Sequence, residues 1–231
     1  MIDNFYLLVA MPRSGSKFVD RNLNEYIKHK RNNSGSSLGC QSIFCQQNEK
    51  DKIIVNSKWQ TNILNDISLL YNIINKHTFY TTAKIHPVSI WEKDLIKKLN
   101  GNAFKSIATV RCNKFEQCIS WAVMHKLNSW ALTSDSNSKI EELCCNPFHI
   151  DEADFLSYST LYEEQINFID TLDNIRVVDL DQLLTIKNSR EFCTLLGLDT
   201  LDFQIKFDYH IEYGTKKFDM VKNISDLKKL L

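Results

Sequence analysis

The chain has 231 residues, with 28 basic and 28 acidic side chains, a formal net charge of zero and a hydrophobic content of 43%. These values indicate a folded protein, and they exclude a disordered chain or one drawn to nucleic acid or anionic membrane by its overall charge. The sequence has no signal-peptide pattern and no apolar run near the ~18 residues of a transmembrane helix, so we expect a chain without a membrane segment. Seven cysteines, an odd number without a C-x-x-C pair, favour reduced thiols and a cytoplasmic location.

A strongly apolar stretch runs directly into a short basic turn near the start of the chain. Residues 5–11 (Phe-Tyr-Leu-Leu-Val-Ala-Met) predict a strand buried in a parallel sheet, and Pro12 ends it. Residues 13–17 (Arg-Ser-Gly-Ser-Lys) are polar and cationic, and a helix is expected from Ser16. Free amide groups and the positive end of the helix dipole then meet two basic side chains. This arrangement predicts a phosphate or sulfate cradle, and the alternative is an ordinary strand-to-helix turn that is basic.

Further strands and helices alternate along the chain. Besides residues 5–11, the β-rich segments predict strands at 53–55, 78–84, 104–110 and 175–178. Apolar periodicity predicts helices from residue 16 to about 27, and over 63–74, 88–99, 114–130, 151–172 and 190–196, with a last helix from about residue 225. Residues 28–39 and 133–138 have loop composition, and residues 203–213 are strand-like or irregular.

This alternation predicts a single α/β domain over residues 1–231, with a mostly parallel sheet flanked by helices. In such sheets ligands bind beyond the carboxyl ends of the strands. The chemically interesting groups follow four of the predicted strands. They are Pro12 with Arg13, Lys84 with His86, Arg111, and Asp179 with Asp181. We therefore expect one shared site at this edge of the sheet.

Lys84 and His86 are two residues apart at the end of a predicted strand, so their side chains face the same way. An imidazole can remove a proton from an acceptor hydroxyl, and an ammonium group can stabilise charge on a leaving group. The pair therefore predicts a transfer reaction. The alternative is an exposed lysine and a structural histidine before a turn.

Three stretches together resemble sulfotransferases that use 3′-phosphoadenosine-5′-phosphosulfate (PAPS). Residues 12–18 resemble the loop that binds the 5′-phosphosulfate and lack the Walker A spacing. Residues 84–87 are similar to the Lys-x-His-x-Pro segment of cytosolic members, although Pro87 follows the histidine directly. Residues 108–121 resemble the 3′-phosphate segment, with Arg111 and Ser120 separated by nine residues (120 − 111 = 9) where the family has eight, so Cys112 stands where that spacing requires arginine.

The resemblance implies a P-loop NTPase-like sulfotransferase fold with PAPS as donor and no metal. It assigns the 5′-phosphosulfate to the loop Arg13, Ser14, Gly15, Ser16, Lys17 and Phe18, whose aromatic ring is expected near the adenine or, alternatively, in the core. It assigns the 3′-phosphate to Arg111 and Ser120, with Lys216 and Lys217 closing on it unless they are simply solvated. His86 is the expected general base, helped by Lys84 and Arg13. Glu25 is the alternative base, since carbohydrate-type members use a glutamate near the first helix.

The acceptor is a small molecule or a glycan bearing a hydroxyl, such as a sugar or phenol, or else a peptide tyrosine, and the sequence does not specify its identity or the oligomeric state. We expect the loops 31–60 and 131–150 to shape its pocket. Two other functions stay open: a nucleotide kinase or hydrolase of the same broad fold, and a non-catalytic nucleotide- or partner-binding relative. Cys144 and Cys145 beside His149 suggest a metal site, but no second ligand pair has zinc-site spacing.

Overall fold

The computed structural model describes residues 5–32, 41–42, 65–76, 80–101, 104–127, 137–207 and 216–231. The expected strand at 53–55, most of the expected acceptor loop 31–60 and residues 131–136 of the second loop lie outside these residues. The chain divides into two compact units, each taken by itself below. Unit 1 comprises Met1–Val110 with Phe168–Phe207, and unit 2 comprises Arg111–Asn167 with Asp208–Leu231.

Unit 1 contains a parallel sheet. Its strands are β1 (Tyr6–Ala10), β2 (Gln41–Ser42), β3 (Tyr80–Ile85), β4 (Lys105–Val110) and β5 (Ile175–Asp179), in the order β2-β3-β1-β4-β5. Every ladder between them is parallel, with Val9 beside Ile85 and Ala10 beside Thr109. After β1 the chain adds β2 and β3 on one side and later β4 and β5 on the other, so the strand order switches at the carboxyl end of β1. Ligands of open parallel sheets bind at such a point.

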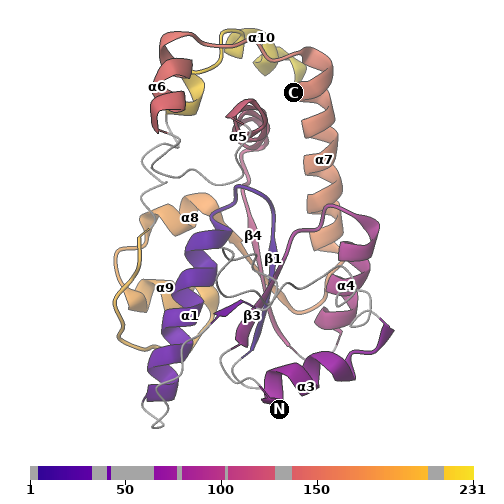
Figure 1. Cartoon of the computed structure of the whole chain (residues 1–231), viewed down its shortest axis with the longest axis vertical. Helices are drawn as coiled ribbons and strands as arrows, with labels where there is room; N and C mark the ends of the chain where they lie inside the picture. The colour runs from indigo at the N-terminus through magenta and orange to yellow at the C-terminus, as the bar shows by residue number, and fades with distance from the viewer. Residues whose placement is uncertain are drawn as a thin grey trace. The chain divides into compact units, whose positions relative to one another are not determined.

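Helices cover both faces of this sheet, as the apolar character of β1 requires. All five β1 residues are buried. Helices α1 (Ser16–Asn32) and α9 (Ser189–Leu196) lie on one side and α4 (Ile90–Asn100) on the other (Figure 1). The core on the α1 side joins β1 and β4 to α1, α8 (Leu180–Thr185) and α9. The expected α/β class with a parallel, helix-flanked sheet is confirmed.

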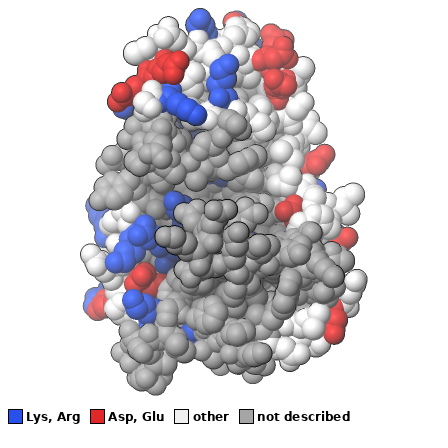
Figure 2. All heavy atoms as spheres, in the orientation of Figure 1, with Lys and Arg blue, Asp and Glu red and all other residues white. Residues whose placement is uncertain are grey.

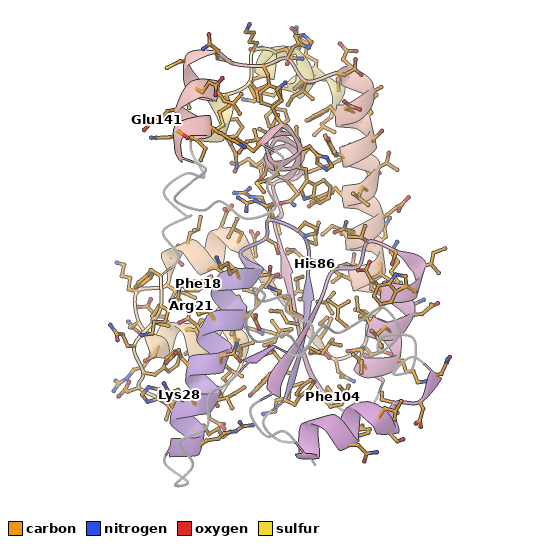
Figure 3. The ribbon with its side chains drawn as sticks, viewed as in Figure 1. Phe18, Arg21, Lys28, His86, Phe104 and Glu141 are labelled. Atoms are coloured by element: carbon orange, nitrogen blue, oxygen red, sulfur yellow. The ribbon has the colours of Figure 1, made fainter. Side chains whose placement is uncertain are left out.

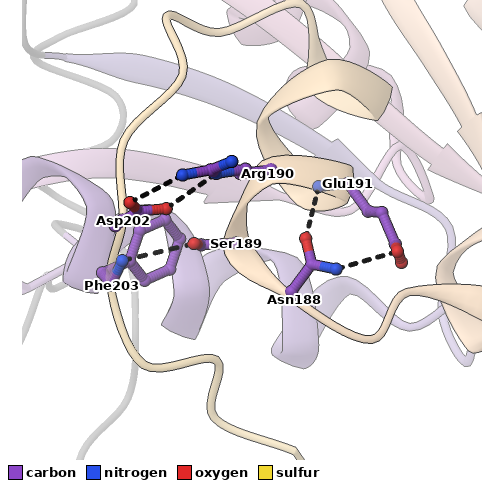
Figure 4. Close-up of polar contacts among 6 residues, drawn as sticks. All are labelled: Asn188, Ser189, Arg190, Glu191, Asp202 and Phe203. Carbon is purple, nitrogen blue, oxygen red and sulfur yellow. Dashed lines mark hydrogen bonds and ion pairs between the residues drawn. The ribbon is translucent and has the colours of Figure 1, made fainter.

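Helix α9 shows how local sequence fixes an element of unit 1. The side chain of Asn188 caps its first turn by accepting a hydrogen bond from the Glu191 amide at 3.0 Å, and Gly197 ends it in a left-handed conformation. Arg190 pairs with Asp202 at 3.1 Å, while the Ser189 hydroxyl accepts from the Phe203 amide (Figure 4). These contacts attach residues 202–203 to the start of the helix.

Unit 2 is helical. It contains α5 (Lys114–Leu127), α6 (Asn137–Cys145), most of α7 (Glu152–Asp170), the 3₁₀ turns η3 (Lys216–Phe218) and η4 (Lys228–Leu230), and the short α10 (Ile224–Leu227). Its own apolar core is built from α5, α6, α7 and the last residues of the chain. The buried Asn223 side chain pairs with the backbone of Ile150, which ties the chain end to the start of α7.

Most expected helices match the structure within a few residues, including α4, α5, α7 and α9. Helix α3 (Ser68–Lys76) overlaps the helix expected over 63–74. Three differences concern where helices begin or end. Helix α1 continues to Asn32, into the loop expected at 28–39. Helix α6 begins at Asn137, inside the loop expected at 133–138. Helix α8 follows β5 directly because a capping box of Asp179 and Gln182 starts it. Within the described residues no helix has both the length and the apolar character to cross a membrane.

Asn22 allows a test of how unit 1 is held together. This fully buried α1 side chain accepts from the Lys206 amide at 2.8 Å and donates to the Lys206 carbonyl at 3.0 Å. Replacing it with alanine leaves both backbone groups without these partners. We expect Asn22→Ala to lower the free energy of unfolding by about 2 kcal/mol, measured by urea denaturation.

The matched control is Lys28→Ala, an exposed position on the same helix. It is expected to change the free energy of unfolding by no more than about 0.5 kcal/mol. Equal effects of the two substitutions would contradict a holding role for the Asn22 amide.

Candidate functional site

The loop after β1 is anchored by hydrogen bonds of Ser14. Its amide and its hydroxyl both donate to the Met11 carbonyl, the hydroxyl at 2.6 Å. Because that hydroxyl hydrogen is used, the Thr109 hydroxyl donates to the Ser14 oxygen across 2.7 Å. The Met11 amide in turn donates to the Thr109 carbonyl. The fully buried Ser14 side chain therefore holds the loop onto the carboxyl end of β4, and its expected contact with a ligand stays a prediction.

The backbone of this loop leaves amide groups open to an anion. Arg13 has φ 66° and Gly15 has φ 77°, both in the left-handed region. Alternation of such residues with ordinary ones forms concave nests of N–H groups. The first hydrogen bond into α1 runs from the Val19 amide to the Gly15 carbonyl. The amides of residues 15–18 donate to no acceptor among the described residues, and the first turn of α1 carries no acidic side chain. This is the geometry of an anion cradle.

The described charged side chains near the loop are few, which fits a local site of this kind. On the face drawn in Figure 2, the described basic and acidic side chains lie in small groups of both signs. Lys17 is exposed at the start of α1, and Arg13 is half-buried in the loop. The two cations predicted for the cradle, Arg13 and Lys17, thus belong to the loop and to the first turn of α1.

His86 follows the last residue of β3 and lies at the same end of the sheet as the loop. Its Nδ1 is 2.6 Å from the carbonyl oxygen of Ala10, the last residue of β1. A carbonyl only accepts, so Nδ1 carries the hydrogen and the lone pair of the neutral ring is on Nε2. Figure 3 shows His86 at one end of the strands and Phe104 at the opposite end. The imidazole is thus oriented by the strand that leads into the cradle.

The surroundings of His86 keep its ring neutral. Burial, the largest effect, lowers its pKa below the usual 6.5, and the nearby charge of Lys84 lowers it further. The hydrogen bond to Ala10 and the negative charge of Glu92 act in the opposite direction and do not outweigh these effects. At neutral pH the side chain therefore offers Nε2 as a proton acceptor.

Asp20 is a site residue that the sequence did not reveal. It is buried on α1, accepts a hydrogen bond from the Thr82 hydroxyl at 2.6 Å and lies 3.9 Å from the Lys84 ammonium group. Burial raises the pKa of Asp20, while Lys84 and Thr82 act to lower it. An acidic residue within the apolar stripe of an amphipathic helix was the available signal. Asp20 thus positions Lys84, whose charge acts on His86 two residues later.

The side chains of two other residues predicted from the sequence, Phe18 and Glu25, lie away from the open amides of the loop. Phe18 belongs to the core of unit 1, with its ring centroid 6.0 Å from that of Phe192 and 6.2 Å from that of Phe207. The core alternative describes this position, and contact with an adenine stays a prediction. Glu25 comes nine residues after Ser16 in α1, which is about 13 Å along the helix axis. Asp20 is one turn from the cradle, whereas Glu25 is more than two.

The remaining sequence candidates form a second group, in unit 2. Arg111 follows β4, and its guanidinium Nη2 is 3.4 Å from Glu116 Oε2 on α5. The ammonium group of Lys217 is 2.8 Å from the same oxygen, so one carboxylate joins two of the predicted cations. Ser120 is buried one helical turn after Glu116, and Lys216 is exposed. Glu116 was not expected from the sequence.

The structure thus places the predicted residues in two sets. Unit 1 holds Arg13 to Phe18, Lys84 and His86, and unit 2 holds Arg111, Ser120, Lys216 and Lys217. Among the described residues, Cys144, Cys145 and His149 take part in no cluster of three or more metal-ligating side chains.

The close packing of Gly15 makes the cradle testable. A Cβ on Gly15 would lie 2.7 Å from Leu180 Cδ1 and 3.1 Å from Leu183 Cδ1, in addition to its φ of +77°. We expect sulfate to raise the melting temperature of the wild type. Gly15→Ala is expected to cost about 2–3 kcal/mol of stability and to remove that rise.

Gly197→Ala is the control, because this residue has φ +65° but no atom within 4 Å of an added Cβ. It is expected to cost about 1 kcal/mol and to keep the response to sulfate. Equal losses of stability, or a sulfate response retained by Gly15→Ala, would exclude this role of the loop.

Comparisons with known proteins give no family for the chain. The sequence matches no protein-family model and no curated protein, and no solved structure matches the fold. The resemblance to sulfotransferases therefore depends on the motif residues alone. A function has to be inferred from the geometry of these side chains.

Proposed function

We propose that the chain is a sulfotransferase that moves a sulfuryl group from PAPS to an acceptor hydroxyl, on a P-loop NTPase-like sulfotransferase fold. One observation carries the proposal. The imidazole of His86 is hydrogen bonded to Ala10, two residues before the loop whose open amides form an anion cradle. This hydrogen bond orients the imidazole at the carboxyl end of β1, where the strand order switches, and so supports a role for His86 as the base of a transfer reaction.

The donor side of the reaction is supported by the loop. Gly15 has the left-handed φ of 77° that turns the loop, and the amides of residues 15–18 offer donors to sulfate and phosphate oxygens. Arg13 and Lys17 add positive charge there. In the proposal these groups hold the 5′-phosphosulfate, which supplies the sulfuryl group. Arg111 and Ser120, with Lys216 and Lys217, hold the 3′-phosphate.

The acceptor side is supported by the state of His86. The acceptor oxygen forms a bond to sulfur while the bond between sulfur and the bridging phosphate oxygen breaks. Nε2 of His86 takes the proton from the acceptor, and the negative charge that develops on the departing phosphate oxygen is stabilised by Lys84 and Arg13. Asp20 holds Lys84 through an ion pair of 3.9 Å. Adenosine 3′,5′-bisphosphate is the second product.

Ligand binding gives the first test. Adenosine 3′,5′-bisphosphate at about a hundred times its dissociation constant stabilises a protein by roughly 2.7 kcal/mol. For a chain of this length the melting temperature is expected to rise by roughly 5–10 °C, measured by thermal unfolding. ATP with magnesium is the comparison ligand. A larger shift with ATP and magnesium favours a kinase or nucleotide hydrolase and overturns the proposal, as does no shift with the bisphosphate.

Substitution of His86 gives the second test. His86→Asn keeps a side-chain donor for the Ala10 carbonyl and removes the base. We expect kcat to fall about 100-fold or more while the thermal shift with the bisphosphate persists. The measurement is turnover of PAPS with a panel of phenolic and sugar acceptors. If the wild type turns over none of these acceptors, a non-catalytic relative is favoured.

The pH dependence of the wild type checks the same assignment. The pKa of His86 is lowered below 6.5, so the ring is neutral at about pH 7. kcat/KM is therefore expected to stay level as the pH falls from about 7 and to decrease only as the pH passes down through that lowered pKa. His86→Asn should lose this acidic limb. Glu25→Gln is the comparison variant, and a greater loss of kcat there would move the base to Glu25.

A further inference from the structure

One carboxylate in unit 2 lies between two cationic side chains that are predicted to bind a phosphate. Glu116 Oε2 accepts from Lys217 at 2.8 Å and lies 3.4 Å from the guanidinium of Arg111. Its other oxygen, Oε1, accepts from the Asn113 side chain at 3.2 Å. The Lys217 ammonium group also lies 5.0 Å from the ring centroid of Phe218. Both cations therefore point at a single anionic oxygen.

The three side chains differ in exposure. The side chains of Arg111 and Lys217 are 8% and 6% exposed, whereas that of Glu116 is 32% exposed. Buried cations are costly without an anion, and among the described residues Glu116 is the carboxylate that both of them contact. Because the Glu116 side chain is more exposed than the two cations, it is the group that can turn toward solvent. We therefore expect Glu116 to be the group that another anion replaces.

We propose that Glu116 is the internal occupant of a phosphate site formed by Arg111 and Lys217, and that a phosphate monoester displaces it on binding. The inference rests on the proposed function, in which these cations hold the 3′-phosphate of the donor. It adds that Glu116 sets the affinity for that group. The hydrogen bond and charge of Lys217 and the charge of Arg111 lower the pKa of Glu116 despite its burial, so the carboxylate competes as an anion at neutral pH.

The chemistry favours a dianionic ligand. A carboxylate brings one negative charge to two cations, whereas a phosphate monoester brings nearly two and has three acceptor oxygens in place of two. A ligand with a single negative charge gains little binding free energy here, because it only replaces the single charge of the Glu116 carboxylate. The site thus selects a terminal phosphate group over a carboxylate or a phosphodiester.

The test compares Glu116→Gln with the wild type in binding adenosine 3′,5′-bisphosphate and adenosine 5′-monophosphate by isothermal titration calorimetry. Removing the competing charge is expected to lower the dissociation constant of the bisphosphate about tenfold. Binding of the monophosphate, which lacks the 3′-phosphate, is expected to stay within about twofold of the wild type. An unchanged or weaker affinity of Glu116→Gln for the bisphosphate overturns the inference while leaving the proposed function in place.

The control is Glu163→Gln, which removes the partner of Lys114 at an exposed ion pair of the same unit and should leave both affinities unchanged. Failure of the wild type to bind the bisphosphate overturns the proposed function, and the inference with it. Glu116→Gln could be unfolded without ligand. In that case circular dichroism measures refolding, and refolding with the bisphosphate but not with the monophosphate supports the inference. A variant that stays unfolded with both ligands overturns it.

Discussion

The burial of β1 on both faces is the constraint on which the rest of unit 1 depends. A strand of five buried residues needs a partner strand on each edge and a helix over each face. Its neighbours β3 and β4 come from later parts of the chain and run parallel to it. Their carboxyl ends therefore meet at one edge of the sheet. The loop after β1 and the imidazole after β3 lie together for that reason, before any ligand is considered.

Each set of candidate side chains contains an acidic residue that holds a cation in place. Asp20 lies against Lys84, and Glu116 lies against Arg111 and Lys217. The amides of the cradle, in contrast, have no acceptor among the described residues. In the proposed function, anion binding at the loop therefore uses oriented dipoles, which act over a short range, together with the charges of Arg13 and Lys17. A chain with zero net charge can hold an anion in this way without a basic surface.

The sequence predicted β1, β3, β4, β5 and the long helices because burial and periodicity are local patterns, whereas the two-residue strand β2 was too short to give such a pattern. Strand ends then indicated which polar residues share the sheet edge. Asp20 and Glu116 were not predicted, since their importance comes from contacts across 62 residues to Thr82 and 101 residues to Lys217. Helix α6 begins in a stretch with loop composition, where packing of Ile140 in the core of unit 2 outweighs local propensity. The division into two units likewise depends on long-range packing.

The left-handed backbone of Arg13 affects which substitutions this loop tolerates. A non-glycine residue at φ 66° is held at a cost of about 1 kcal/mol. Glycine would relieve that cost and would also remove the guanidinium from the cradle. Selection for thermal stability alone would therefore favour glycine here, whereas selection for anion binding keeps arginine. In directed evolution, position 13 is where the two kinds of selection should give different residues.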